Sequence, residues 1–183
     1  MTNQATDLSF PIGTQAEWRA GDAAYTEAAR VEMIRDIELL PRALELAVQD
    51  LSEAQLHTPY RPGGWTVHQL VHHVADSHIN AYVRFKLALT EDHPTIKPYD
   101  QDAWARLSDT ATLPVNVSLT LLHALHRRWV ELLTDITPSE WDRTIYHPER
   151  KETITLWQLL KTYSWHSVHH TAHINRLRER MQW

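Results

Sequence analysis

Histidines gathered in two short stretches give this chain the means to bind a metal ion. Seven of the thirteen histidines fall within residues 72–78 (HHVADSH) and 166–173 (HSVHHTAH). Neutral imidazole is the commonest side-chain metal ligand at cellular pH. His166 and His170 are four residues apart, which on a helix places both imidazoles on one face, about one turn from each other. Such a pair can bind one ion, and the first stretch offers candidates for a third ligand.

Two readings of the second stretch remain open at this point. His166 and His170 lie on the apolar stripe of their predicted helix, so they are expected to face the protein interior. A shared metal would satisfy both, whereas an unpaired buried polar group costs about 1–3 kcal/mol. His169 and His173 have the same spacing and form a competing pair, rotated by about 60°. The alternative is that all four are hydrogen-bonded core or surface histidines without a metal.

The first stretch is less decisive. On the predicted helix, His78 lies closest to the centre of the apolar stripe, while His72 and His73 lie on opposite flanks. Periodicity alone therefore favours His78 as the third ligand.

Composition narrows the class of protein. The chain has 183 residues, 43% hydrophobic and 22% charged, which predicts one globular domain spanning residues 1–183. A net charge of −5 and the lack of a basic stripe argue against nucleic-acid binding. No apolar run predicts a membrane span, and MTNQATDLSF does not resemble a signal peptide. The absence of cysteine leaves only nitrogen and oxygen ligands and is consistent with a cytoplasmic protein.

Periodicity and capping signals predict an all-α fold. Helices are expected over residues 22–52, 66–91, 115–136 and 155–181, with a kink or break in the first at Pro41. Capping boxes starting at Thr66 and Thr155 mark two helix starts, and a third at Thr137 opens a short helical turn. Residues 53–65, 92–113 and the segment through 147–149 are predicted as loops. The long connection 92–113 would let the third helix run parallel to the second, in a four-helix bundle with metal sites between facing helices.

At this level of detail the sequence resembles a known family. The segment GGWTVHQLVHHVADSHINAYVRFKLALTEDHPTIKPYD, followed by HPE and YSWHSVHHTAHI, is similar to the DinB/YfiT-like metalloenzymes, and closest to the YfiT branch of metal-dependent hydrolases and bacillithiol transferases. The resemblance extends from FPIG near the N-terminus to the C-terminal tryptophan. It implies an up-down-down-up four-helix bundle and a homodimer. After FPIG the family has a proline-containing stretch where this chain has TQAEWRAGDAAY, so the N-terminal part of the pocket departs from the pattern.

The resemblance also implies a ligand set. The histidine directly before V-A-D matches the family ligand of the second helix, which is His73, and the pair on the last helix maps to His166 and His170. This choice overrides the periodicity argument and leaves His78 beside the site. Three neutral ligands and an open position would suit a catalytic Zn²⁺ or Ni²⁺ that activates water or a thiolate.

Other residues are assigned roles around this metal. Asp76 lies three residues after His73 and is expected to orient a ligand imidazole, with a solvated carboxylate as the alternative. Glu149 is a candidate general base, or else an exposed loop residue. The expected substrate pocket comprises Arg61, Trp65, His78, Arg84 and Tyr99. Trp165 is a further candidate for its wall, although core packing would also explain both tryptophans.

Several functions are compatible with these residues. The first is transfer of a small thiol, such as bacillithiol, to an electrophile; the second is hydrolysis by metal-bound hydroxide. A metal-binding or ligand-binding module without turnover would close the site with a fourth ligand, His78 or His169. A purely structural bundle would bind no stoichiometric metal.

Overall fold

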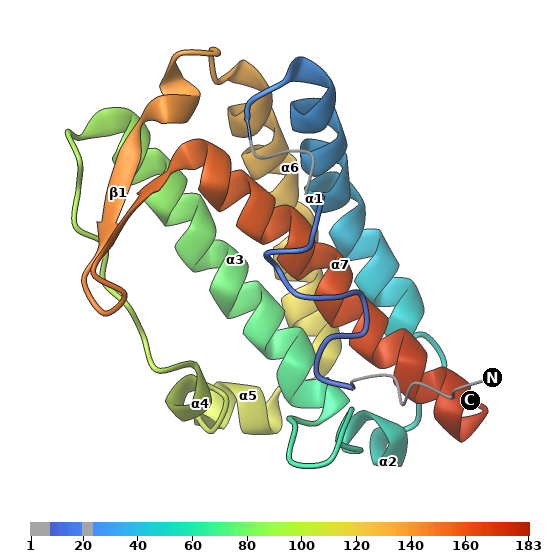
Figure 1. The fold of residues 1–183 in the computed structure, drawn as a ribbon. Coiled ribbons are helices and arrows are strands. Elements are labelled where there is room, and N and C mark those ends of the chain that lie inside the picture. The colour runs from blue at the N-terminus through green and yellow to red at the C-terminus, as the bar shows by residue number, and fades with distance from the viewer. Residues whose placement is uncertain (1–7, 20–23) are drawn as a thin grey trace.

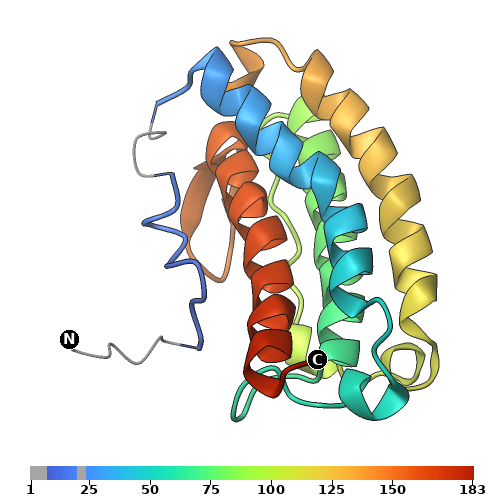
Figure 2. The same cartoon turned by 90° about the vertical axis from the view of Figure 1, so that its right-hand side faces the viewer.

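Four long helices form the body of the protein. The computed structural model describes residues 8–19 and 24–183. The long helices are α1 (Glu27–Val48), α3 (Val67–Thr90), α6 (Val115–Asp135) and α7 (Leu156–Met181). α1 and α3 each pack against α6 and α7. α1 and α7 run in one direction and α3 and α6 in the other (Figures 1 and 2), which confirms the up-down-down-up bundle.

Local sequence signals explain where the helices begin. The side chains of Thr66 and Thr155 each accept a hydrogen bond from the third helical residue, and both predicted capping boxes are present. Helix α1 begins after Thr26, whose side chain caps it, so it starts later than predicted. Pro41 lies inside α1 without dividing it. The third predicted box precedes a single 3-10 turn, η2 (Glu140–Asp142).

The connections contain more regular structure than expected. A hairpin of β1 (Thr144–His147) and β2 (Glu152–Thr155) replaces the loop predicted around residues 147–149. Its strands are rich in threonine, isoleucine and tyrosine, which favour the pleated backbone. Short helices α2 (Glu53–Leu56), α4 (Gln101–Trp104) and α5 (Ser108–Thr112) interrupt the other two predicted loops. The chain also joins the hairpin at Ile96, whose N–H donates to the Tyr146 carbonyl at 3.0 Å.

The buried apolar residues form two clusters with histidines between them. One cluster contains Phe85, Trp129 and Trp141, and the other contains Leu70, Leu122 and Ile174. On α7 the histidines of residues 166–173 lie between the segments that build these clusters, and on α3 His78 lies between them while His73 lies among residues of the second cluster. The bundle therefore carries a polar layer at mid-height. Among the described residues, no helix combines the length and apolar character that a membrane span requires.

Candidate metal centre

Three histidines from two helices converge in the polar layer. His73 of α3 and His166 and His170 of α7 each contribute one ring nitrogen, and these nitrogens lie within 4.8 Å of one another. The His73 ring lies 5.5 Å from the His166 ring and 5.1 Å from the His170 ring, centroid to centroid. The Nε2 atoms of His166 and His170 are 3.1 Å apart. The three residues that the family resemblance implied as ligands are thus brought together.

The geometry and protonation of this group fit a bound divalent cation. Two nitrogens bonded to one ion at about 2.0–2.1 Å are separated by about 3–3.5 Å, and the His166–His170 pair already shows this spacing. Burial lowers the pKa of His73 to about 4 and the pKa values of His166 and His170 well below the usual value for histidine. All three are therefore neutral at pH 7 and can offer lone pairs. Nδ1 of His170 is buried and lacks a hydrogen-bond partner among the described residues.

His78, which the sequence placed in the substrate pocket, lies behind His166 and is not among the residues that line the cavity beside the cluster. It is completely buried, and its Nε2 lies 3.0 Å from Nδ1 of His166. Its own Nδ1 lies 2.9 Å from Nε2 of His126 on α6. The apolar stripe of α3 places His78 at the centre of the bundle, where it contacts His166 from the side opposite to the three grouped nitrogens.

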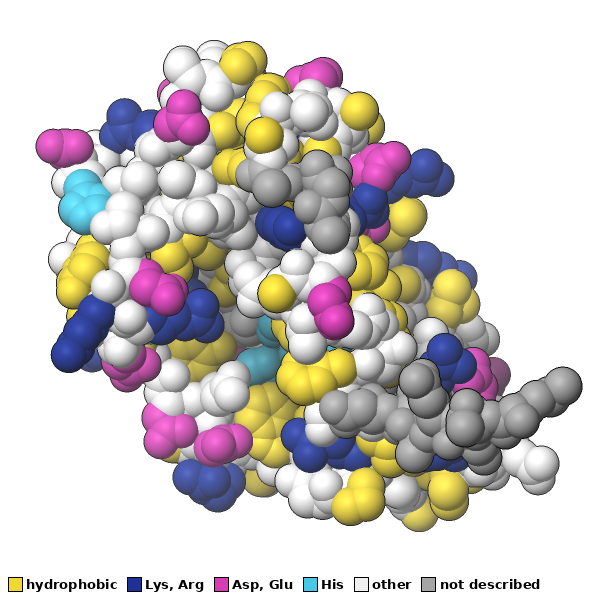
Figure 3. All heavy atoms as spheres, viewed as in Figure 1, with side chains coloured by type: hydrophobic (Ala, Val, Ile, Leu, Met, Phe, Trp, Pro, Cys, Tyr) yellow, Lys and Arg dark blue, Asp and Glu magenta, His cyan; other side chains and the backbone are white. Residues whose placement is uncertain are grey.

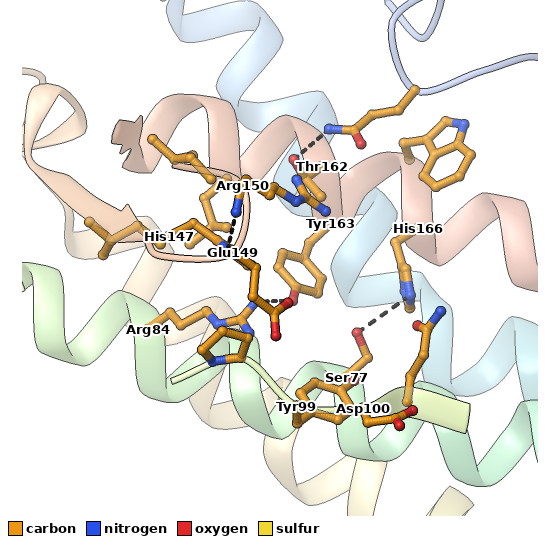
Figure 4. A pocket seen from close by; sticks show the side chains of 17 residues that line it. Ser77, Arg84, Tyr99, Asp100, His147, Glu149, Arg150, Thr162, Tyr163 and His166 are labelled. Carbon is orange, nitrogen blue, oxygen red and sulfur yellow. Dashed lines mark hydrogen bonds between the residues drawn. The ribbon is translucent and has the colours of Figure 1, made fainter. Parts of the chain in front are cut away.

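A cavity of about 610 Å³ opens beside the cluster. Its wall includes His166, and it lies among α3, α7, the hairpin and the segment that follows Pro98. In Figure 3 this face of the molecule is hollowed, with a histidine side chain visible at the floor. Arg84 and Tyr99, two of the residues proposed from the sequence for a substrate pocket, line the cavity. Glu149 projects into the cavity from the hairpin turn, where it lies near Arg84 of α3 and Tyr163 of α7 (Figure 4). The cavity therefore borders one member of the cluster, His166.

Two expected site residues have other neighbours. Arg61 does not line the cavity; it lies over the Tyr60 ring and acts electrostatically on His169 and His173. The Asp76 carboxylate makes no hydrogen bond to a ligand imidazole among the described residues. Burial and the charge of Asp109 raise the pKa of Asp76 to about 6.

The two tryptophans lie at the edges of the site. The Trp65 ring centroid is 4.5 Å from that of His73, and its indole N–H donates to Asp102 at 3.0 Å. Trp165 lines the cavity and stacks on His169, with 4.0 Å between the centroids. Its indole N–H donates to the carbonyl of Gly13. The N-terminal segment is thus tied to α7 beside the cavity at Gly13, the last residue of FPIG.

Sequence reasoning missed several residues of this region. Tyr163, His147 and Arg150 line the cavity, and His126 contacts His78, with Nε2 of His126 2.9 Å from Nδ1 of His78. His126 was detectable in principle, because it falls on the same helical stripe as Leu122, Trp129 and Leu133. The cavity residues of the hairpin could not be placed while the hairpin was taken for a loop.

Comparisons with known proteins agree with this geometry. The profile of the DinB superfamily matches residues 36–174. A protein of Bacillus mycoides (strain KBAB4) named "Putative metal-dependent hydrolase" is 51% identical over 97% of this chain and 99% of its own length. A protein of Bacillus cereus (strain 03BB102) with the same name shows the same identity and coverage.

A solved structure is similar over nearly the whole chain. It is described as "YfiT from Bacillus subtilis is a probable metal-dependent hydrolase with an unusual four-helix bundle topology". It superposes with a TM-score of 0.90 at 47% identity, covering 96% of this chain and 98% of the other.

Proposed function

The chain belongs to the DinB superfamily, and from this premise we propose that it is a metal-dependent enzyme that activates a nucleophile. His73, His166 and His170 would hold one divalent ion, Zn²⁺ or Ni²⁺. One observation carries the proposal: three neutral imidazoles from two helices converge beside a cavity of about 610 Å³. When bound, a divalent ion of this kind lowers the pKa of a thiol or water ligand, so that the nucleophile forms at neutral pH.

The favoured reaction is transfer of a low-molecular-weight thiol of the bacillithiol type to an electrophile. The cavity offers side chains for each part of this reaction. Arg84 and Arg150 suit an anionic group on either reactant, because a guanidinium binds carboxylate or phosphate with parallel hydrogen bonds. Glu149 offers a carboxylate that can accept the thiol proton. The Tyr163 hydroxyl, which lies 3.5 Å from Arg84 Nη1, can donate to an oxygen of the electrophile.

The proposed step balances in atoms and electrons. The thiol gives its proton to Glu149, and the sulfur lone pair forms a bond to the electrophilic carbon. The leaving group departs with the electron pair of the bond that breaks, and it can take the proton back from Glu149. No oxidant or reductant is required.

Hydrolysis is the second candidate, and the names of the relatives favour it. The same residues would serve it with water as the nucleophile and an ester or amide as the substrate. Both reactions differ from a binding module, which would show no turnover, and from a purely structural bundle, which would bind no metal.

Metal content tests the site itself. Purified protein should contain about one zinc or nickel ion per chain by elemental analysis, and His73→Ala should lose it. His123→Ala is a matched control, because His123 lies on α6 with a side chain that is 48% exposed. Equal metal content in the parent and His73→Ala would contradict the proposed site.

Turnover with different nucleophiles separates the two reactions. Metal-loaded protein would be mixed with monochlorobimane and a panel of small thiols, and in parallel with chromogenic esters and amides. We expect metal-dependent conjugation of at least one thiol. Ester or amide cleavage without conjugation would support the hydrolase instead. The absence of both activities would support a binding module. The expected homodimer is a separate proposal, which light scattering tests.

A further inference from the structure

A proline in the middle of α1 leaves one backbone carbonyl without its helical donor. In an α-helix the carbonyl of residue 37 would accept from the N–H of residue 41, but Pro41 has no N–H. Ile37 is completely buried, so an unpaired carbonyl here would be costly. Nδ1 of His126, from the neighbouring helix α6, lies 2.6 Å from this oxygen. A histidine of another helix therefore replaces the missing helical hydrogen bond.

That contact determines which nitrogen of His126 carries the proton. A carbonyl oxygen only accepts, so Nδ1 of His126 must donate. Burial lowers the pKa of His126 to about 4, so the ring is neutral at pH 7 and its Nε2 bears a lone pair. The neighbouring nitrogen, Nδ1 of His78 at 2.9 Å, must then be the donor to that lone pair.

The same logic passes from His78 to His166. His78 is completely buried between two other histidines, and a neutral ring that donates from Nδ1 accepts at Nε2. Nδ1 of His166 lies 3.0 Å from that atom and must carry a proton. Nε2 of His166 is left with a lone pair, and this is the atom 3.1 Å from Nε2 of His170.

We infer that His126 and His78 are positioning residues that hold His166 in the Nδ1-protonated tautomer, with the chain of hydrogen bonds anchored on the carbonyl freed by Pro41. The inference rests on the proposed function in one respect, namely that His166 is a metal ligand. In water the Nε2-protonated tautomer of histidine predominates. In that tautomer Nε2 of His166 would carry a proton and would have no lone pair to offer a metal ion. The chain of hydrogen bonds through Ile37, His126, His78 and His166, called the relay below, disfavours this tautomer before any ion binds.

Tautomer assignment tests the relay without metal. Nitrogen-15 NMR of metal-free protein at pH 7.5 should show His126, His78 and His166 all protonated on Nδ1 and unprotonated on Nε2. Protonation of Nε2 on any of the three would overturn the relay. This readout does not depend on whether the protein binds metal, so it judges the relay even if the proposed function fails.

Variants of His126 test the effect on metal affinity. His126→Leu removes both the donor and the acceptor, whereas His126→Gln keeps an amide oxygen that can accept from His78. Loss of a group that orients a metal ligand typically weakens binding by about 10–100-fold. We expect a loss of that size for His126→Leu in chelator-competition titrations with zinc, and recovery to within about 3-fold of the parent for His126→Gln.

His123→Leu is the matched control on the same helix, where the side chain is 48% exposed. Equal affinities for His126→Leu and His123→Leu, with zinc binding intact in the parent, would overturn the relay but not the metal site. If His126→Leu fails to fold, His126→Gln and the NMR assignment decide. In that case a 10-fold or larger loss in His126→Gln, or an Nε2-protonated His78 or His166, would reject the inference.

Discussion

Helix α7 carries two histidine pairs that look alike in isolation. His166 and His170 are four residues apart with their Nε2 atoms 3.1 Å from each other, and His169 and His173 repeat this spacing at 3.0 Å. All of these rings are largely buried. Within residues 8–19 and 24–183, only the first pair forms a group of three with a histidine of another helix, His73 of α3, in which the ring nitrogens lie within 4.8 Å of one another. The spacing that suggested a metal site therefore does not distinguish the pairs; the helix that faces each pair does.

The surroundings of the second pair oppose a cation. Burial lowers the pKa of His173 to about 3, and the charges of His169, Arg61 and Arg180 act in the same direction. Arg61 also contributes to lowering the pKa of His169 to about 4. Guanidinium groups that disfavour a proton on these rings also disfavour a metal ion. The His169 ring is stacked on Trp165 and the His173 ring contacts Tyr60, which suggests a packing role for this pair.

Removing one histidine from each pair should give the largest difference. His170→Ala should lose stoichiometric metal and weaken zinc binding by more than about 100-fold, beyond the range typical of residues that only orient a ligand. His173→Ala should keep the metal, because it leaves all three proposed ligands in place. Chelator competition measures the zinc affinity of both variants, and elemental analysis measures their metal content. Equal losses in the two variants would erase the distinction between the pairs.

The cavity on one side of the first pair leads to a second prediction. Glu149→Gln should lower turnover by about 10²–10⁴-fold, the usual contribution of a positioned general base. Zinc affinity should stay at the parent value, because Glu149 is not one of the grouped ligands. Steady-state kinetics and a metal titration on the same preparation separate the two effects. A Glu149→Gln enzyme with normal turnover would remove Glu149 from the mechanism.

Acid should lower the free energy of unfolding by protonating both histidine pairs of α7, but bound metal should oppose protonation only in the pair His166 and His170. In the folded state the pKa of His170 in the first pair lies well below the value of about 6.5 in an unfolded chain, and the pKa of His169 in the second pair is about 4. The unfolded state therefore binds more protons between these values, and the free energy of unfolding falls as pH falls. The slope is about 1.4 kcal/mol per pH unit for each such histidine, and it vanishes above about pH 7.

Urea unfolding from pH 7.5 to 4.5 measures this slope in metal-free and zinc-loaded protein. Zinc binds neutral imidazole, so its stabilising effect should be large at pH 7.5 and shrink as the ligands compete with protons. A free energy of unfolding that stays level from pH 6.5 to 4.5 would show that the buried histidines are not held neutral by the fold.

The sequence predicted the fold more fully than the site. Capping boxes at Thr66 and Thr155 fixed two helix starts, because they depend only on neighbouring residues. The parallel course of α3 and α6 followed from the length of the connection between them. The hairpin was missed because two four-residue strands provide little periodicity.

The ligands show the limit of periodicity most clearly. His78 has the most central position on α3 and is completely buried, as the stripe predicted. His78 does reach α7, but it meets Nδ1 of His166, on the side away from the Nε2 atoms that His166 and His170 bring together. The histidine whose ring lies close to both members of that pair is His73. That relation depends on how two helices are placed, which a single-helix pattern does not contain. The role of His126 likewise required knowing that α6 approaches Ile37.

Pro41 offers the smallest and most selective change. In Pro41→Ala a backbone N–H returns to α1 and competes with His126 for the Ile37 carbonyl. The carbonyl has two lone pairs and can accept both donors, so only part of a hydrogen bond worth about 0.5–1.5 kcal/mol is lost to the relay. We expect zinc affinity to fall by about 2- to 5-fold.

The same substitution should stabilise α1, since alanine is favoured over proline in helix interiors by about 3 kcal/mol. Thermal melting of Pro41→Ala should therefore give an unchanged or higher Tm, whereas zinc titration of the same variant should give a higher Kd. If Pro41 contributes only packing, the two quantities should fall together, and the link between α1 and the metal pair of α7 would be lost.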